Sequence, residues 1–321
     1  MAHAPSPPVH TPMPTTPARP LRLLAVGGIC ATRILRVPAI PPAPAKVLAD
    51  AGCEVVDGMA LSAAFAFAKL GGRAALWARA GDDAGGHAMR NGLAAEGIDV
   101  RGLRLLPGAR SSCSSVIVDG RGERLVVPFH DPGLDPDPGW LPLHEVGGFD
   151  GVHVDPRWPE GARAALAEAR RAGRLAMLDA DVAPAPVLDS LLPLASHAVF
   201  SDAGLFAYTG LDALEPALRQ VARSHPGHVG ASCGAAGYAW LEDGALHRVA
   251  APVVPVVDTL AAGDVFHGAL ALSLLEGRAM TEAARFACAA ASLKCSRFGG
   301  RLGCPGRAEL DAFLGTGTLP A

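Results

Sequence analysis

One short stretch of the chain combines acids, small residues and a long apolar run. The stretch VVDTLAAGDVFHGALAL covers residues 256–272, and its second acid, Asp264, directly precedes an almost wholly apolar run over 265–275. Such a run predicts a buried helix, whose first N–H groups lack intrahelical partners and attract anions. The residues just before Asp264 leave the backbone open to a ligand because they are small: Ala261, Ala262 and Gly263. The pattern predicts an anion site beside a carboxylate, although an Asp at a helix start can also be a simple N-cap.

The composition of the chain limits the classes of function. A formal charge of -3 and a pI near 6.4 give no basic surface, so nucleic acid is not an expected partner. The seven cysteines are scattered without a C-x-x-C pair, which argues against a disulfide framework and a zinc site. No apolar run has the length and purity of a membrane span. We expect a cytoplasmic protein with neither a nucleic-acid nor a membrane partner.

The chain is expected to form one large domain behind a short tail. Residues 1–20 contain seven prolines and no apolar segment, which predicts a disordered Pro-rich tail rather than a signal peptide. Residues 21–321 are numerous enough to bury the core of a single α/β domain.

Strand-like and helix-like segments alternate along this domain. The alternation predicts a mostly parallel central sheet flanked by helices on both faces. The expected strands of this sheet are residues 21–28, 73–81, 151–155, 174–181, 197–201 and 228–233. The expected helices include residues 60–72, 84–97, 159–172 and 213–225. Strands inserted at about 34–56 and 111–129 do not fit this layering, and we expect them to form a small separate sheet.

Four segments rich in glycine or polar residues follow predicted strands. They are VGGICAT, HVDPRW, GASCGAAG and the DTLAAGD stretch itself. Ligands of open α/β sheets bind beyond the carboxyl ends of the strands, so these segments are expected to meet at one site. Each of these signals is weak alone; a plain hairpin turn, for example, explains the G-x-x-G of Gly234 to Gly237 at least as well.

These motifs together resemble the PfkB, or ribokinase-like, family of carbohydrate kinases. DTLAAGDVFHGAL is similar to the second signature of that family, D-T-x-G-A-G-D followed by F-x-G-A. GMALSAAFAFAKLGGRAALWARAGDDAGG is similar to its first signature, and the resemblance extends from about residue 21 to 314. It implies a ribokinase-like α/β domain with a β-sheet lid, ATP with magnesium as cofactors, and a sugar-like substrate. A monovalent cation is an additional candidate cofactor, and many members pair through the lid as homodimers.

The resemblance also assigns roles to individual residues. Asp264 matches the catalytic base, which accepts the proton of the substrate hydroxyl as it attacks the γ-phosphoryl group. The backbone of Ala261, Ala262 and Gly263 matches the anion hole, although the family has glycine where Ala261 stands. A methyl group there is costly only if the backbone needs a positive φ. The residues expected on the nucleotide side are Ser232, Gly234, Gly237, Asp258, Thr259 and Cys295.

The substrate side departs from the family pattern. Thr32 stands where the family has a sugar-binding Asp, and Ser62 stands where it has a sugar-binding Asn. Asp57 replaces the first glycine of the pair that Gly58 completes. These residues and Arg157, which could pair with an anionic group, are the expected substrate contacts. The usual metal motif is absent, so the metal ligands stay unknown, with Asp202 as a substitute to test.

Two functions and two kinds of acceptor follow from these departures. The first function is an ATP-dependent kinase acting on a hydroxyl of a sugar or sugar-like molecule. The second is an impaired or non-catalytic relative that binds nucleotide or sugar. If an acceptor pairs with the Asp57 carboxylate, it should be an amino sugar or a polyol; if a protein arginine pairs with it, an ordinary ketose or an anionic sugar fits. The candidate arginines are Arg33, Arg36 and Arg157.

Two further residues have simpler expected roles. His267 lies one turn inside the apolar helix, where a core histidine is expected more than a catalytic one. Lys294 lies in the last turn of the penultimate helix, where its charge complements the helix dipole.

Overall fold

The first strand of the chain is buried on both faces, as a central parallel strand requires. In the computed structural model, which describes residues 19–319, strand β1 turns Leu23 and Ala25 to one face and Leu24 and Val26 to the other. All four side chains are fully buried. The apolar run has no polar alternation because helices cover both faces of the strand.

Nine strands form the large sheet in the order β13-β12-β11-β10-β9-β8-β1-β4-β5. Seven of them are parallel: β1 Arg22–Val26, β4 Arg73–Gly81, β5 Asp99–Leu106, β8 Gly151–Val154, β9 Leu175–Ala180, β10 His197–Ser201 and β11 His228–Ser232. Two antiparallel strands, β12 Tyr238–Glu242 and β13 Ala245–Val249, complete one edge. All parallel strands therefore end at the same side of the sheet.

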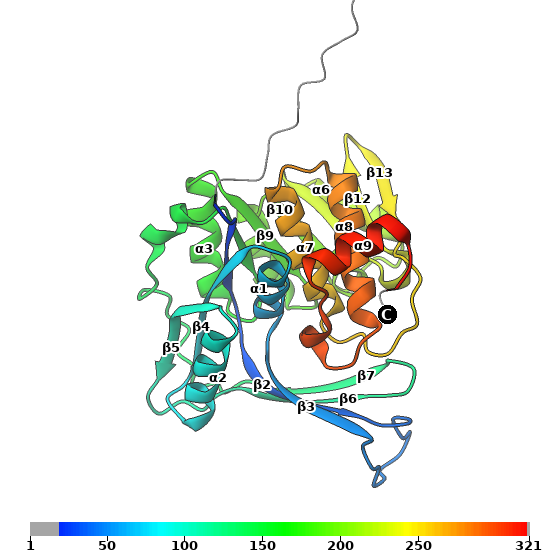
Figure 1. Cartoon of the computed structure of the whole chain (residues 1–321). Helices are drawn as coiled ribbons and strands as arrows, with labels where there is room; N and C mark the ends of the chain where they lie inside the picture. Colours follow the sequence, from blue (N-terminus) through cyan, green and yellow to red (C-terminus); the bar gives the residue numbers. More distant parts are fainter. Residues whose placement is uncertain (1–18, 320–321) are drawn as a thin grey trace, which may run out of the picture.

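Helices cover the two faces of this sheet (Figure 1). One face carries α1 Met59–Lys69, α2 Ala84–Ala95, α7 Ala262–Leu275, α8 Met280–Cys295 and α9 Arg307–Thr316. The other carries α3 Pro159–Arg171, α4 Ala185–Leu191, α5 Asp202–Thr209 and α6 Leu214–Ala222. The predicted mostly parallel sheet with helices on both faces is confirmed. Strand β5 and helices α4 and α5 were not predicted.

A second sheet of four strands lies apart from the first and forms the lid (Figure 1). Its order is β3-β2-β6-β7, with β2 Cys30–Arg36, β3 Ala51–Asp57, β6 Cys113–Val118 and β7 Arg124–Phe129. Strand β2 pairs antiparallel with β3 and parallel with β6, and β6 pairs antiparallel with β7. One face packs through Ile34 and Val116 against Leu260 of the body. Strand β2 begins four residues before the predicted start of the lid segment at residue 34.

The edge strand β7 leaves part of the lid open to solvent. Its side chains Leu125, Val127 and Phe129 are between 40% and 58% exposed. The expected homodimer through the lid stays a prediction. Within residues 19–319, no helix has the length and hydropathy needed to cross a membrane. The predicted tail of residues 1–20 lies almost wholly outside the described residues.

Candidate active site

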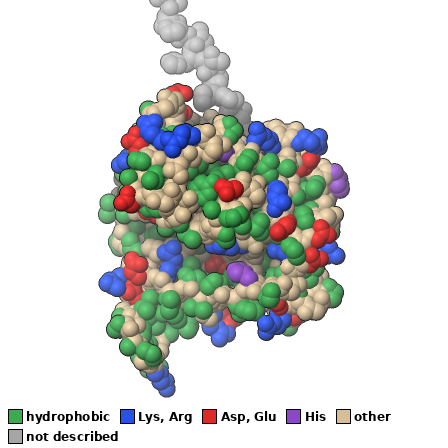
Figure 2. Space-filling model, turned by 180° about the vertical axis from the view of Figure 1, so that it is seen from behind, with side chains coloured by type: hydrophobic (Ala, Val, Ile, Leu, Met, Phe, Trp, Pro, Cys, Tyr) green, Lys and Arg blue, Asp and Glu red, His purple; other side chains and the backbone are tan. Residues whose placement is uncertain are grey.

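A cavity of about 500 Å³ lies between the lid and the carboxyl ends of the parallel strands. Figure 2 shows this side of the molecule hollowed between the body and the lid. The lid contributes Thr32, Val116 and Arg124 to the lining, and the start of α7 contributes Ala261 to Asp264. Segments far apart in the sequence therefore meet where an open α/β sheet binds its ligands.

The start of helix α7 has the geometry of an anion site. Ala261 occupies the N-cap position with φ 62°, and Asp264 lies in the first turn. Asp264 is therefore not the N-cap, and the left-handed backbone of Ala261 is the costly case for a methyl group. Among the expected donors, the N–H of Ala262 already points to the carbonyl oxygen of Thr259 at 3.3 Å. The N–H of Gly263, in the first turn, has no intrahelical acceptor.

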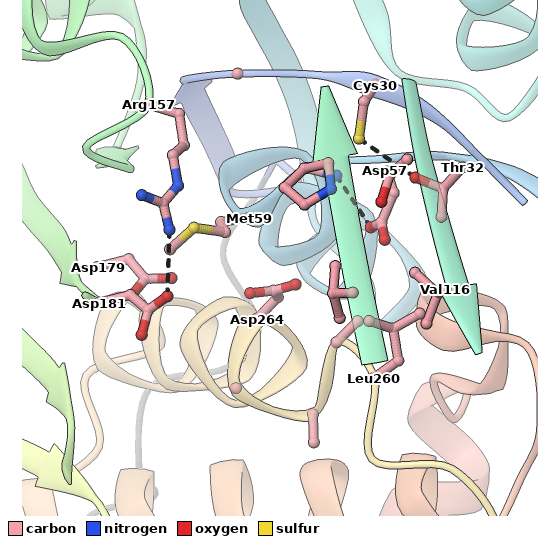
Figure 3. Close-up of a pocket in the computed structure, with 18 of the residues that line it drawn as sticks. Cys30, Thr32, Asp57, Met59, Val116, Arg157, Asp179, Asp181, Leu260 and Asp264 are labelled. Carbon is pink, nitrogen blue, oxygen red and sulfur yellow. Dashed lines mark hydrogen bonds and ion pairs between the residues drawn. The ribbon is translucent and has the colours of Figure 1, made fainter. Parts of the chain in front are cut away.

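Asp264 lies in the middle of a group of carboxylates (Figure 3). Asp179 and Asp181, at the end of β9, line the cavity on one side of it, and Asp57 lines the other. Desolvation, then the negative charge of Asp179, raises the pKa of the Asp264 carboxyl well above its ordinary value. Desolvation and Asp181 raise the pKa of Asp179 in the same direction. The site thus holds several acids that disfavour one another's ionisation.

Sequence reasoning missed three of the acids at this site: Asp155, Asp179 and Asp181. Each lies at or just after the carboxyl end of a strand that was predicted, and an acid in that position was the available signal. Asp155 is fully buried, and its carboxylate accepts hydrogen bonds from the N–H groups of Gly28, Ala60 and Arg157. A Cβ at Gly27 would lie 2.0 Å from this carboxylate, which explains that glycine. Asp155 therefore ties together the loops that follow β1 and β8.

The altered substrate residues bind one another. Oδ1 of Asp57 accepts hydrogen bonds from the Ser62 hydroxyl at 2.6 Å and from the N–H of Gly58 at 3.0 Å. Ser62 is fully buried and does not line the cavity, whereas Asp57 and Gly58 do. Ser62 therefore orients Asp57 rather than facing the cavity in place of the family Asn.

None of the three candidate arginines pairs with Asp57. Arg33 pairs with Glu54, and Arg36 pairs with Asp50 at 2.7 Å, both on the exposed part of the lid. Arg157 lines the cavity but donates to the carbonyl oxygen of Val182 at 3.1 Å and lies 3.5 Å from Asp181. The alternative in which a protein arginine neutralises Asp57 is not what the structure shows.

The remaining predicted substrate residue, Thr32, is buried at the cavity wall. It is 3% exposed, and its hydroxyl lies 3.3 Å from the sulfur of Cys30. Figure 3 shows Thr32 and Asp57 on the same side of the cavity, facing Asp264 across it. A polar side chain therefore remains where the family has its Asp, but without a negative charge.

The six predicted nucleotide residues divide into three pairs. Ser232 and Thr259 line the cavity. Gly234 and Gly237, with φ 52° and 89°, form the turn between the antiparallel strands β11 and β12. This is the plain hairpin turn that was the other explanation of the G-x-x-G pattern. A Cβ at Gly237 would lie 2.0 Å from the carbonyl oxygen of Val249, so only glycine fits there. The predicted metal substitute, Asp202, does not line the cavity, whereas Ser201 and Asp181 do.

Asp258 and Cys295 lie behind the cavity rather than in it. The Asp258 side chain is fully buried and accepts hydrogen bonds from Leu260, Gly299 and Gly300. The carbonyl oxygen of Cys295 accepts hydrogen bonds from the N–H groups of Val257 and Asp258. Both residues hold the loop before α7 in place.

The lid also contacts this loop directly. Arg124 of β7 donates to the hydroxyl of Thr259 at 2.7 Å, and that hydroxyl donates to the carbonyl oxygen of Gly122 at 2.8 Å. Arg124 lines the cavity, and its guanidinium contacts the loop two residues before Ala261. Sequence reasoning did not single out Arg124, since nothing in its local pattern marks it.

His267 is buried, as expected of a core histidine, but it also reaches the cavity wall. It is 2% exposed; its Nδ1 lies 3.3 Å from Nε2 of His153, and its Nε2 lies 3.6 Å from Asp179. Burial lowers the pKa of His267 to about 4, so the ring is neutral at neutral pH. A neutral ring does not offset negative charge on the neighbouring Asp179.

Comparison with known proteins agrees with this architecture. Residues 21–306 match the family described as pfkB family carbohydrate kinase. A ribokinase from Haemophilus influenzae is 26% identical over 91% of this chain and 98% of its own length. The crystal structure of a presumed ribokinase from Agrobacterium tumefaciens superposes with a TM-score of 0.88 at 41% identity, covering 92% of this chain and 97% of that one. Arabidopsis thaliana ribokinase, solved with ribose and ATP, has the same fold: TM-score 0.77, 23% identity, coverage 92% and 98%. The chain has a ribokinase-like fold and belongs to the pfkB family of carbohydrate kinases.

Proposed function

We propose that the protein transfers the γ-phosphoryl group of ATP to a hydroxyl of a sugar or sugar-like small molecule. The observation that carries this proposal is the position of Asp264. Its carboxylate lies in the first turn of a buried helix, next to Ala261, Ala262 and Gly263, which line the same cavity. A base and an anion site side by side are what phosphoryl transfer to an alcohol requires.

Asp264 acts as the general base in this proposal. The acceptor hydroxyl gives its proton to the Asp264 carboxylate while its oxygen forms a bond to the γ-phosphorus, and ADP leaves with the electrons of the broken P–O bond. A raised pKa makes the ionised Asp264 carboxylate a stronger base toward the hydroxyl proton. The N–H groups at the start of α7 and the Arg124 guanidinium stabilise the charge on the phosphoryl group.

In this proposal the nucleotide and its metal bind where Thr259, Ser232 and Asp181 contribute to the cavity. ATP as donor is supported by family membership and by the ATP-bound state of the Arabidopsis relative. Asp181 and the Ser201 hydroxyl supply oxygen donors of the kind Mg²⁺ prefers, and they lie within hydrogen-bond distance of each other. When bound there, Mg²⁺ would neutralise charge on the β- and γ-phosphates.

The acceptor is expected to offer hydroxyl or amino groups to Asp57. That carboxylate lines the cavity with Ser62 and Gly58 as its donors and has no arginine partner. A polyol or an amino sugar therefore complements it, with Thr32 as a further polar contact. Arg157 lies at the same cavity and adds a place for an anionic substituent.

The direct test is ADP release by the purified protein with ATP–Mg²⁺ and a set of acceptors. The set should contain aldoses, ketoses, polyols, amino sugars and anionic sugars. Turnover of one acceptor near ordinary enzyme efficiency, about 10⁴ M⁻¹s⁻¹ or more, supports the proposal. ATP or sugar binding by calorimetry without ADP release above background for any acceptor would instead favour the non-catalytic alternative.

A further inference from the structure

Lys294 is a buried cation behind the loop that leads into α7, and the chemistry proposed above does not use it. It lies in the last turn of α8, and none of its surface is exposed. Its Nζ donates to the carbonyl oxygen of Asp258 at 2.5 Å and lies 3.4 Å from Oδ2 of the same residue. Burial lowers the pKa of Lys294, and the negative charge of Asp258 opposes that shift. The side chain therefore does more than complement a helix dipole at the surface.

The partner of Lys294 is fixed on every side. Oδ1 of Asp258 accepts a hydrogen bond from the N–H of Leu260 at 2.8 Å. Oδ2 accepts hydrogen bonds from the N–H groups of Gly299 and Gly300, both at 2.9 Å. Asp258 stands three residues before Ala261, so these bonds hold the loop that leads into the anion site. A shift of this loop would move the N–H groups that face the phosphoryl group.

We propose that Lys294 is a built-in cation that replaces a monovalent metal ion at the anion site. The inference rests on the proposed function. An ammonium group and K⁺ carry the same charge and are of similar size, and both bind carbonyl and carboxylate oxygens. The two Asp258 oxygens that could hold such an ion already contact the ammonium. A free monovalent cation therefore does not fit beside Asp258, and Lys294 acts as a positioning residue for the loop.

The electrostatic reason is the burial of the charge. A positive charge excluded from water acts through a low effective dielectric and is screened little by salt. This strengthens its attraction to the Asp258 carboxylate, 3.4 Å away, and so holds the loop on whose other side the phosphoryl group is proposed to bind. On the cavity side Arg124 contacts Thr259, so the loop lies between one buried and one exposed cation.

The test compares two Lys294 variants that both remove the charge but differ in how much space they leave beside Asp258. Lys294→Ala removes the charge and opens room for an ion between Asp258 and α8. Lys294→Met removes the charge but fills the room with an uncharged chain. Each is assayed for kcat and for the temperature of unfolding in KCl, NH₄Cl and choline chloride at equal ionic strength. Arg297→Met is the matched control, because Arg297, just after α8, pairs with Glu309 of α9 and does not contact Asp258.

The native protein should have the same kcat in KCl and in choline chloride. Both Lys294 variants should lose about 10- to 100-fold in kcat, as expected when the donors are misplaced. KCl or NH₄Cl should raise kcat of Lys294→Ala, whereas Lys294→Met should not respond. Arg297→Met should behave like the native protein in all three salts. A native kcat that requires K⁺, full activity of Lys294→Ala, or no rescue of that variant by any monovalent ion would overturn the proposal.

The unfolding temperature separates this inference from the kinase proposal. KCl should raise the unfolding temperature of Lys294→Ala relative to choline chloride, and it should leave the native protein and Lys294→Met unchanged. This readout needs no acceptor and no turnover. A K⁺-dependent rise in the native protein would show that a free cation binds after all. If neither variant folds, the K⁺ response of the native kcat and unfolding temperature still decides the question.

Discussion

The strained N-cap of α7 gives a prediction whose sign and size follow from one dihedral angle. Ala261 has φ 62°, a conformation that costs an L-residue with a Cβ about 1–2 kcal/mol. Ala261→Gly removes this cost but adds about 0.4–1 kcal/mol of chain entropy to the unfolded state. The net expectation is a free energy of unfolding that rises by about 1 kcal/mol. Since the loop already has the required backbone conformation, kcat should stay near the native value.

The assay is urea unfolding followed by circular dichroism, with Ala262→Gly as the control. For a chain of this size a slope of about 3 kcal/mol per molar urea converts the gain into a midpoint shift of about 0.3 M. Ala262 is the next residue and has a negative φ within helix α7, so the same substitution there should not stabilise the protein. The result would contradict backbone strain at Ala261 if Ala261→Gly is no more stable than the native chain, or if Ala262→Gly raises the urea midpoint by the same amount.

Three further predictions concern the site and the core. Asp181→Asn should raise the Mg²⁺ concentration needed for half-maximal activity, while Asp202→Asn should not; equal effects of the two changes would remove Asp181 as the proposed ligand. The double variant Asp57→Gly with Ser62→Asn restores the family pattern and should turn common hexoses into substrates; unchanged binding and turnover of every sugar would mean that this loop does not face the acceptor. Burial lowers the pKa of His197 to about 4 from 6.5, so the unfolded state binds more protons between these values, and stability should be lost as pH falls through this window. His197→Gln should weaken this loss in thermal unfolding measured from pH 7 to 4, and an unchanged pH profile would show that His197 does not contribute to it.

The start of α7 could be predicted from the sequence because its signal is local. An apolar run after small residues determines both the helix and the open backbone before it, so Asp264 and Gly263 were found before any fold was known. The strand ends were also predictable, yet the acids on them were not singled out. Asp155 and Asp181 directly follow a buried strand, and Asp179 is the last residue but one of β9, so their positions at strand ends could have indicated them.

Contacts between distant segments could not be predicted in the same way. Lys294 is 36 residues from Asp258 in sequence, and only the packing of α8 against the loop before α7 reveals their pair. Arg124 reaches Thr259 across 135 residues because the lid lies over the loop. The Asp57–Ser62 hydrogen bond spans five residues, but a strand end and a helix start meet there at an angle that no periodicity encodes. Residue types and spacing can locate a site in the sequence. The role of each charged residue depends on hydrogen-bond and ion-pair partners that only the folded structure shows.

The central claim is that Asp264 removes the proton of the acceptor hydroxyl during phosphoryl transfer. The most direct measurement is kcat for ADP release by Asp264→Asn, with an acceptor that the native protein phosphorylates, at saturating ATP–Mg²⁺. We expect a loss of about 10²–10⁴-fold in kcat, as is typical for a general base, with ATP affinity by calorimetry close to native. An Asp264→Asn variant that keeps the full native kcat would contradict that claim.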